Sequence, residues 1–226
     1  MENTSSDALS AIICTLQYLN EPWGIKDLNS RHLYMNSAAR AYTSTPPGFC
    51  LEGKYDYEFP APWSEQSDGF IAHDKLAESA AETVSVIETD YWYNQRHLEP
   101  YLSEKIPLRD SGGMCIGTLW NAKRIKVISP LVCVGKKAPS IIQTSLPSSV
   151  FTTSEMNVVY LLLNRLSRKE IAAILGLSLK TINTNIERIY LKSGVHSLIQ
   201  FEEYCENVGL KNYLPAHFLN KGIVFI

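Results

Sequence analysis

A chain of 226 residues is long enough for two small domains, and a hydrophobic content of 45% is typical of a globular protein. No apolar run approaches the roughly 18 residues that a membrane span needs. The first eight residues, MENTSSDA, carry acids and no basic cluster, so we expect neither export nor membrane anchoring.

The cysteines argue against a disulfide framework and against a zinc site. There are five, an odd number, and none of them forms a CxxC pair. They are Cys14, Cys50, Cys115, Cys133 and Cys205. This pattern favours a reduced, cytoplasmic protein without a bound metal.

Charge is unevenly distributed, although the formal net charge is only −2. Residues 1–110 hold 17 acidic and 8 basic side chains, whereas residues 151–226 hold 6 and 8. Only the C-terminal half therefore suits a polyanionic partner. With so few basic residues, we expect a lone C-terminal domain to bind DNA weakly and to lose affinity steeply with salt.

A Pro- and Ser-rich stretch without acids, containing Pro130, Pro139 and Pro147, marks a linker. It separates a mixed α/β half from a helical half. The expected parts are an amphipathic helix in 1–20, a sensory or dimerisation domain in 21–128, the linker in 129–149, a helical domain in 150–209 and an apolar tail in 210–226.

The first helix carries one apolar face. Its apolar residues recur at i, i+3, i+4 and i+7, namely Leu9, Ile12, Ile13 and Leu16. A short helix with such a face needs a partner, so we expect these residues to contribute to dimerisation.

Two β-hairpins bracket helical segments in residues 21–128. WGIKDL and HLYMN predict the first hairpin, SAARAY predicts a short helix, and YLSEKIPL with MCIGTLWNAKRIKVI predicts the second hairpin. Strands at both ends with helices between them predict one antiparallel sheet covered by helices, in an α+β fold. The segments PWGIKDLNSRHLYMNSAARAYT and SEKIPLRDSGGMCIGTLWNA resemble a PAS sensory domain. This resemblance implies a five-stranded sheet around a small interior pocket.

The sequence leaves the contents of such a pocket open. Haem would need an axial ligand such as His73 or His97, and Cys50 does not match the motif of a photoactive flavin site, so we expect no cofactor. Several aromatic residues either line a cavity or fill the core, and a filled core is the commoner fate. They are Trp23, Tyr34, Tyr91, Trp92, Tyr93 and Trp120.

The segment SRKEIAAILGLSLKTINTNIERIYLK, residues 167–192, predicts two helices joined by a tight turn. Ser167 and Glu170 form a capping box, Gly176 ends the first helix, and Ser178 caps the second. Ile182, Ile186 and Ile189 then form the inward face of the second helix. Its outward polar face is a candidate for insertion into a major groove, and a merely solvated surface is the alternative.

The whole segment from Phe151 to Ser197 resembles the DNA-binding domain of LuxR/FixJ-type transcription regulators. The matching parts are FTTSE, SRKEIA, LGLS, KTI and IERIYLKSGV. By position, the resemblance implies base contacts from Asn183, Thr184 and Glu187, and phosphate contacts from Lys169, Lys180 and Thr181, with Arg188 beside them. Arg165, Asn185 and Ser193 depart from the family's usual glycine, histidine and leucine, which puts the base preference in doubt.

Ser197 caps a fourth helix, LIQFEEYCENVGL. In LuxR/FixJ-type domains the corresponding helix often forms a dimer contact, which makes Leu198 and Phe201 candidates. The alternative is that they only support the core. The tail is too apolar for a free end, so we expect it to dock.

These observations predict a sequence-specific, DNA-binding bacterial transcription regulator with a PAS-like domain, acting as a homodimer on double-stranded operator DNA. RNA polymerase is a further candidate partner, and no membrane partner is expected. No P-loop, G-x-S-x-G or H-E-x-x-H motif indicates an enzyme. The organisation also resembles TraJ-type activators of plasmid transfer. The alternative function is a regulator that sequesters a protein partner without binding DNA.

Overall fold

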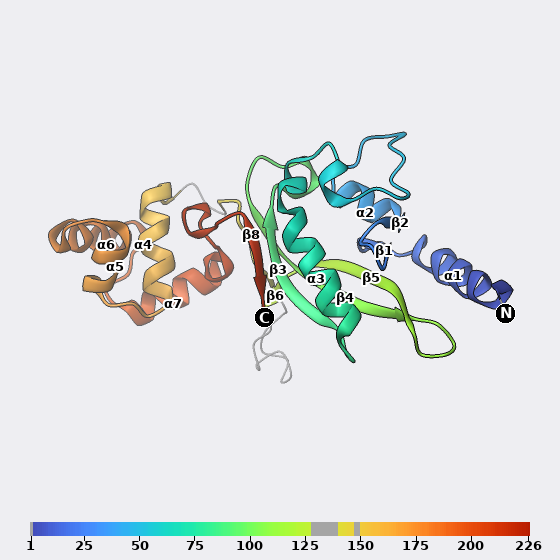
Figure 1. Ribbon diagram of the computed structural model, residues 1–226. Coiled ribbons are helices and arrows are strands. Elements are labelled where there is room, and N and C mark those ends of the chain that lie inside the picture. The colour runs from blue at the N-terminus through green and yellow to red at the C-terminus, as the bar shows by residue number, and fades with distance from the viewer. Residues whose placement is uncertain (1, 128–139, 147–149) are drawn as a thin grey trace. The chain divides into compact units, whose positions relative to one another are not determined.

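The computed structural model describes residues 2–127, 140–146 and 150–226. Contacts divide the chain into two compact units (Figure 1). One contains Met1–Ile125 together with Asn220–Ile226, and the other contains Lys126–Leu219. None of the helices in the described residues is long and apolar enough to cross a membrane.

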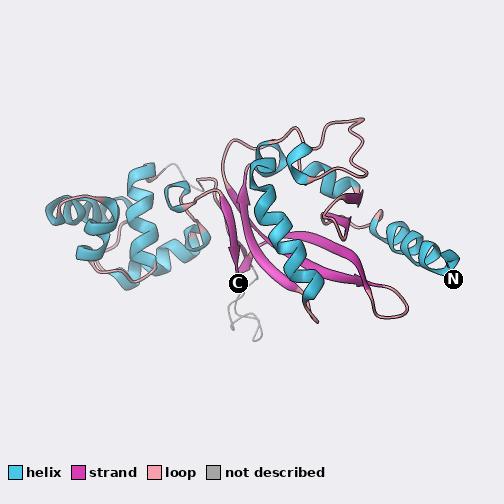
Figure 2. Cartoon of the chain, in the orientation of Figure 1, coloured by secondary structure: helices cyan, strands magenta, loops and turns pink. Residues whose placement is uncertain are grey.

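The first unit is an antiparallel sheet with helices packed against it (Figure 2). Its helices are α1 (Glu2–Leu16), α2 (Ser37–Tyr42) and α3 (Ser67–Ser79), with 3₁₀ helices at Asp56–Glu58, Pro62–Gln66 and Trp92–Asn94. Its strands are β1 (Trp23–Asp27), β2 (His32–Met35), β3 (Val84–Asp90), β4 (Glu99–Arg109), β5 (Cys115–Arg124) and β8 (Gly222–Phe225). The strand order is β2-β1-β5-β4-β3-β8.

Both predicted hairpins are present. β1 pairs with β2, and β4 pairs with β5 over most of their length. Each turn is held by an aspartate at its start: Asp27 accepts the amides of Asn29 and Arg31, and Asp110 accepts those of Gly112 and Met114. These side chains replace main-chain partners that the turn cannot supply, so short local sequences specify both hairpins.

The sheet has one strand more than the PAS resemblance implied. β8 pairs antiparallel with β3, from Thr89↔Gly222 to Val86↔Phe225. The end of the apolar tail therefore docks on the chain's own sheet. The tail is divided between the two units. Its first part belongs to the helical unit, where Leu210 is buried, and only its last residues reach the sheet.

Aromatic side chains fill most of the space between the sheet and its helices. Tyr42 stacks on Trp92 with ring centroids 4.2 Å apart, and Trp63 meets Phe70 edge-on at 5.7 Å. A Cβ on Gly24 would lie 2.4 Å from the Trp120 ring, so only glycine fits at that place in β1. The buried hydrophobic cluster comprises Met35, Ala39, Tyr42, Leu51, Phe59, Trp63, Phe70, Trp92, Tyr101, Trp120 and Ala122.

The apolar face of α1 is partly covered within its own unit. Leu16 is buried, and Leu9, Ile12 and Ile13 are half-buried. A narrow groove separates α1 from the β4–β5 hairpin; Ala8, Leu9 and Ile12 line one side of it, and Leu108 and Ile116 lie on the other. Part of the apolar surface of α1 therefore remains exposed, because the sheet covers only some of it.

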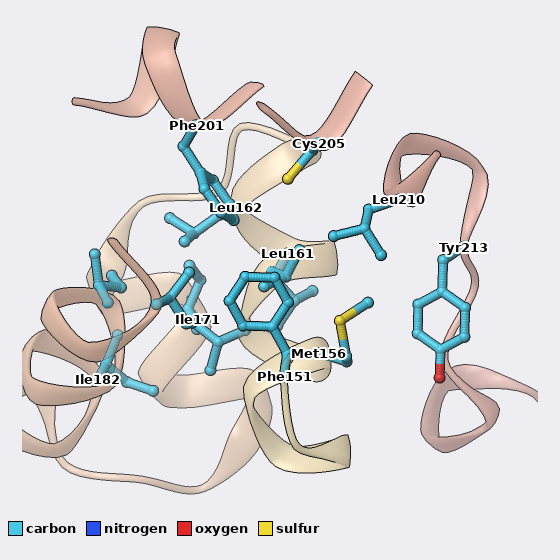
Figure 3. Packing of buried hydrophobic residues seen from close by; sticks show 14 of the residues in the cluster. Phe151, Met156, Leu161, Leu162, Ile171, Ile182, Phe201, Cys205, Leu210 and Tyr213 are labelled. Atoms are coloured by element: carbon cyan, nitrogen blue, oxygen red, sulfur yellow. The ribbon is translucent and has the colours of Figure 1, made fainter. Parts of the chain in front are cut away.

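The second unit is a helical bundle built on the predicted helices (Figure 3). Its helices are α4 (Thr153–Leu163), α5 (Arg168–Leu175), α6 (Leu179–Ser193) and α7 (Leu198–Asn207), followed by 3₁₀ helices at Leu210–Asn212 and Ala216–Phe218. Two short strands, β6 (Lys126–Val127) and β7 (Ser140–Ile141), pair with each other. The core contains Phe151, Met156, Ile171, Ile182, Ile186, Ile189, Phe201, Cys205 and Leu210.

The predicted caps hold the helix-turn-helix in place. Ser167 and Glu170 bond reciprocally at the start of α5, and Gly176 ends α5 with a φ of 63°. Ser178 accepts the amide of Thr181 at the start of α6. Because these are local signals, the sequence specifies the turn between the two helices.

Most of the predicted linker lies outside the described residues, which omit 128–139 and 147–149. The part between them is attached to the helical unit. The Gln143 amide donates to Asn212, and the Leu214 amide donates to Gln143. The helical unit accordingly extends beyond the predicted range 150–209 at both ends.

Candidate functional site

The α6 helix presents one face to its core and the opposite face to solvent. Ile182 and Ile189 are 0% exposed and Ile186 is 1% exposed. Lys180, Thr181, Glu187 and Arg188 are exposed, as is Lys169 near the start of α5. The predicted phosphate contacts therefore lie where a ligand can reach them.

Two predicted base contacts are half-buried and already bonded within the domain. Asn183 Oδ1 accepts from Arg168 Nη1 at 3.0 Å, and Thr184 Oγ1 donates to the Lys180 carbonyl at 3.1 Å. The first bond joins the starts of α5 and α6. To contact a base, Asn183 must therefore either break its bond with Arg168 or make a second hydrogen bond beside it. Sequence reasoning did not single out Arg168, whose only signal is its place beside Lys169.

The electrostatics of α6 suit an anion at its N-terminus. Ser178 caps the helix, its first turn has no acidic residue, and Lys180 adds a positive charge there. Free amides and the helix dipole favour phosphate at such an end. Glu187 lies farther along the helix, where a carboxylate can accept from a base but not bind phosphate.

The C-terminal end of α6 is tied to the start of α4. Lys192 Nζ donates to Glu155 Oε2 at 2.6 Å, and the same carboxylate accepts the Thr152 amide at 2.8 Å. Burial raises the pKa of Glu155, but the bonds from Lys192 and Thr152 lower it more, so its pKa lies below the ordinary value. The Glu155 carboxylate thus caps α4 and also holds the C-terminal end of α6 in place.

The three departures from the family pattern have visible consequences. Arg165 adopts a left-handed φ of 64°, which explains the glycine usual at that place, and its guanidinium pairs with Glu202 at 2.8 Å. Ser193 donates to the Ile189 carbonyl at 2.7 Å, so its hydroxyl is satisfied where a leucine would pack. Asn185 is half-buried beside the inward face of α6.

The predicted dimer contact at Phe201 is wrong. Phe201 is 0% exposed and packs in the core of the helical unit, and Leu198 is half-buried against the same core. A side chain without exposed surface cannot contact a second molecule. The neighbouring Ile199, at 75% exposure, is the apolar side chain that α7 offers to solvent.

The sheet domain contains a small, partly open cavity of about 40 Å³. Both its sheet and its helices contribute to the wall. The lining residues are Lys26, His32, Met35, Tyr42, Thr43, Asp56, Trp63, Phe70, Glu88, Trp92, Ser103, Lys105 and Trp120. Of the aromatic residues singled out in the sequence, Trp92 and Trp120 line this cavity, so the core is mostly but not completely filled.

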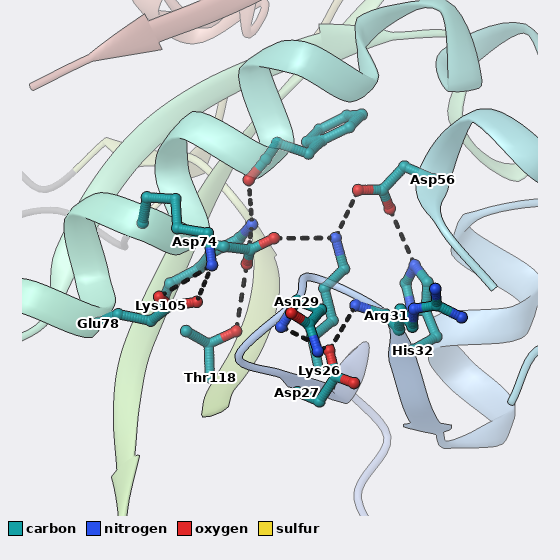
Figure 4. A network of polar contacts seen from close by, with 12 residues as sticks. Lys26, Asp27, Asn29, Arg31, His32, Asp56, Asp74, Glu78, Lys105 and Thr118 are labelled. Atoms are coloured by element: carbon teal, nitrogen blue, oxygen red, sulfur yellow. Dashed lines mark hydrogen bonds and ion pairs between the residues drawn. The ribbon is translucent and has the colours of Figure 1, made fainter. Parts of the chain in front are cut away.

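A network of buried charges borders the cavity (Figure 4). Lys26 Nζ donates to Asp56 at 2.5 Å and to Asp74 at 3.3 Å, and Lys105 also donates to Asp74. His32 Nε2 lies 2.8 Å from Asp56 Oδ1. Two ammonium groups and two carboxylates thus balance each other in a site that is almost completely buried.

The pKa values follow from burial and from this pairing. Burial alone would raise the pKa of Asp56, but Lys26, His32 and Lys105 together outweigh burial and hold the pKa below its usual range, so Asp56 stays ionised. Burial lowers the pKa of Lys105. Burial also raises the pKa of Glu88 from 4.5 to about 7, so this carboxyl titrates near neutral pH.

Other candidates from the sequence lie elsewhere. His73 is buried with Nε2 2.9 Å from the Val84 carbonyl, burial lowers its pKa to about 4, and His97 sits 3.4 Å from Glu99. Cys50 is exposed. Across residues 2–127, 140–146 and 150–226, no cluster of His, Cys, Asp or Glu is arranged to hold a metal ion.

Sequence reasoning missed the charged residues of the cavity. Lys26, Glu88 and Lys105 each stand in a strand and point to the inner face. For two of them a signal was available, since Lys105 shares its strand parity with the buried Tyr101 and Glu88 shares its parity with the buried Val86. Charged residues in strands are usually assigned to the solvent face, which hides this pattern.

Family models match both units. Residues 149–203 match the model described as bacterial regulatory proteins of the luxR family, and residues 16–125 match the model of the PAS fold. The search of curated proteins found no match. These two models account for the helix-turn-helix and for the sheet domain separately.

Solved structures resemble the chain over nearly its whole length. VqmA of Vibrio cholerae in a ligand–DNA complex is 24% identical, with a TM-score of 0.76 and 96% of each chain covered. Phage VqmA bound to DPO is 23% identical, with a TM-score of 0.74, and the match covers 100% of this chain and 99% of that one. At such identities the likeness establishes the fold. The chain therefore has the PAS fold in its first unit and, in its second unit, a helix-turn-helix segment that matches the luxR family model of bacterial regulatory proteins.

Proposed function

We propose that the protein is a cytoplasmic transcription regulator that binds operator DNA as a homodimer, with α6 in the major groove. The observation that carries the proposal is the capped α5–α6 pair with exposed Lys169, Lys180 and Thr181, in a segment that matches the luxR family model. The VqmA complex with ligand and DNA supports the same activity here. The alternative, a regulator that sequesters a protein partner without binding DNA, is not favoured, because the match to the luxR family model and the exposed lysines support DNA binding.

Dimerisation is proposed for two reasons. A single helical domain offers few basic residues, so two copies on two half-sites are needed for firm binding. The half-buried face of α1, formed by Leu9, Ile12 and Ile13 beside the β4–β5 hairpin, is our candidate for the contact. VqmA of Vibrio cholerae, which has been solved as a dimer, supports the stoichiometry.

The PAS cavity is proposed as the site of a small signal molecule. Within the described part of the chain, the Tyr42 hydroxyl and the Trp92 indole nitrogen are buried without a hydrogen-bond partner. Buried polar groups normally have partners, so a ligand with matching polar atoms would complete them. A volume of about 40 Å³ admits only a small molecule, and the DPO bound by phage VqmA is the first compound to try.

Selection from a random duplex pool tests the proposed function. The full-length protein is expected to enrich one sequence with two related half-sites, and footprinting should map protection to both. A variant with Lys180→Glu should enrich nothing, because it places a negative charge at the anion end of α6. Recovery of random sequences by the wild type, with no common half-site, would refute sequence-specific regulation.

A further inference from the structure

The β3 edge of the PAS sheet is occupied by a strand that follows the DNA-binding domain in the chain. β8 pairs with β3 through the register Glu88↔Ile223 and its neighbours, and β3 pairs with β4 on its other side. Among the described residues, strand β8 therefore lies at the edge of the sheet and pairs only with β3.

Side-chain contacts hold β8 in place, in addition to the main-chain pairing with β3. A Cβ on Gly69 of α3 would lie 2.7 Å from Ile223 Cδ1, so α3 leaves a place in which the isoleucine fits. The Phe225 ring meets His73 edge-on at 5.9 Å. Lys221 donates to the Pro62 carbonyl at 2.7 Å and to Glu65 at 2.8 Å. The interaction is specific in position and register.

The contact area of the docked strand is small. The strand has four residues, Val224 on its outer face is 60% exposed, and Phe225 is 47% exposed. A short edge strand with few buried apolar groups belongs to the least stable part of a fold. It can therefore open while the rest of the sheet stays folded.

The connection from β8 to the DNA-binding unit is short. Phe218 stacks on Tyr160 of α4, with ring centroids 5.0 Å apart, and belongs to the helical unit. Lys221 is bonded to the PAS unit, so only Leu219 and Asn220 separate the two attachments. Docked β8 thus holds the helical unit at a second point, in addition to its connection at Ile125–Lys126.

We propose that β8 is a releasable strand whose docking on β3 and α3 restrains the DNA-binding unit, and so sets which half-site spacings the dimer accepts. This rests on the proposed binding of DNA by a dimer. A helical unit that is held at two points samples fewer orientations than one held at a single point. The dimer should therefore bind more tightly to operators whose half-site spacing fits those orientations, and less tightly to operators with other spacings.

Ile223→Asp in the full-length protein tests the docking, with Val224→Asp as the matched control. Both variants add one negative charge to β8, but residue 223 faces α3 and residue 224 faces solvent. Hydrogen exchange should show that Ile223→Asp removes protection from the amides of residues 222–226, whereas Val224→Asp retains it. Equal protection in the two variants would overturn the role of the α3 contact.

The restraint is tested on operators selected by the wild-type protein, with base pairs added or removed between the half-sites. We expect Ile223→Asp to lose roughly tenfold in affinity at the preferred spacing and to discriminate less among spacings. Val224→Asp should behave like the wild type. Release of the strand with an unchanged spacing profile would refute the restraint. Failure of the wild type to select any operator would instead count against the proposed function, and the exchange comparison would still decide whether β8 detaches.

Discussion

In the proposed complex, single side chains on the helical unit are expected to have separable roles, since a lysine attracts every phosphate whereas a short polar side chain distinguishes bases. Lys169 is exposed at the start of α5, so we expect Lys169→Ala to weaken binding to all duplexes alike. The slope of log affinity against log salt should fall by about one ion. Salt titrations on operator and random duplexes measure this.

Thr184→Ala provides the contrasting case. Removal of a base contact should relax discrimination at one or two operator positions by about 1–3 kcal/mol each. An equal loss on specific and random DNA would move Thr184 to the phosphate-binding group. A change of base preference in Lys169→Ala would contradict the assignment of that lysine.

Glu88 makes the stability of the PAS unit depend on pH. Its pKa rises from 4.5 in the unfolded chain to about 7 in the folded protein, so the folded state holds the proton more firmly. The stability from this group is fully present below the unfolded pKa and is lost as the pH rises through about 7. Glu88→Gln cannot lose a proton and should be more stable than the wild type above that pH, by roughly 3 kcal/mol at most.

Denaturant unfolding followed by tryptophan fluorescence measures this difference, because the four tryptophans all lie in the PAS unit. The matched control is Glu104→Gln on β4, whose carboxylate pairs with Lys123 instead of lining the cavity. Identical pH profiles for Glu88→Gln and the wild type would show that folding does not change the pKa of Glu88.

Helices α4 and α6 depend on one carboxylate. Glu155 caps α4 and accepts from Lys192, so Glu155→Ala removes a cap and an ion pair together. We expect a loss of about 1–2 kcal/mol in the stability of the helical unit. Hydrogen exchange of the slowest α6 amides measures it, because the loss should appear as faster global opening.

Glu170→Ala is the appropriate comparison for Glu155→Ala. Glu170 holds the same place in the capping box of α5, but it is exposed and its carboxylate accepts from the Ser167 amide. Glu170→Ala should therefore lower the stability of the helical unit less than Glu155→Ala does. A larger cost at Glu170 would show that the Lys192 pair contributes nothing.

Elements with local signals could be predicted from the sequence. The α5–α6 turn follows from Ser167, Gly176 and Ser178, and the two PAS hairpins follow from alternating apolar residues around short polar turns. β8 could not be predicted, because its partner Glu88 lies far away in the sequence and a four-residue apolar run has no period of its own. The cavity charges were missed because charged strand residues are usually assigned to the solvent face, and the counter-ions that allow Lys26 and Lys105 to be buried come from other elements.

At the scale of the whole molecule, α1 is expected to hold two protomers together. Ile13→Asp places a charge on its half-buried apolar face and should shift the protein toward monomer in sedimentation. Operator affinity should fall with it, by about 10² or more, because avidity is lost.

Ala11→Asp adds the same charge on an exposed position of α1 and should leave the protein dimeric. If Ile13→Asp stays dimeric with full affinity, the contact lies elsewhere, and the exposed Ile199 of α7 is the next residue to change.

The return of β8 to the sheet also determines the order in which the protein can fold during synthesis. The ribosome produces β1 to β5 first and the entire helical unit next, and it makes residues 222–225 only afterwards. Long-range strand pairing is slow to form, and domains generally fold as units as they emerge. The nascent PAS domain must therefore carry an open β3 edge, with the place for Ile223 beside Gly69 unfilled, throughout the translation of the DNA-binding domain. During that interval the edge is a target for chaperones and for strands of neighbouring nascent chains.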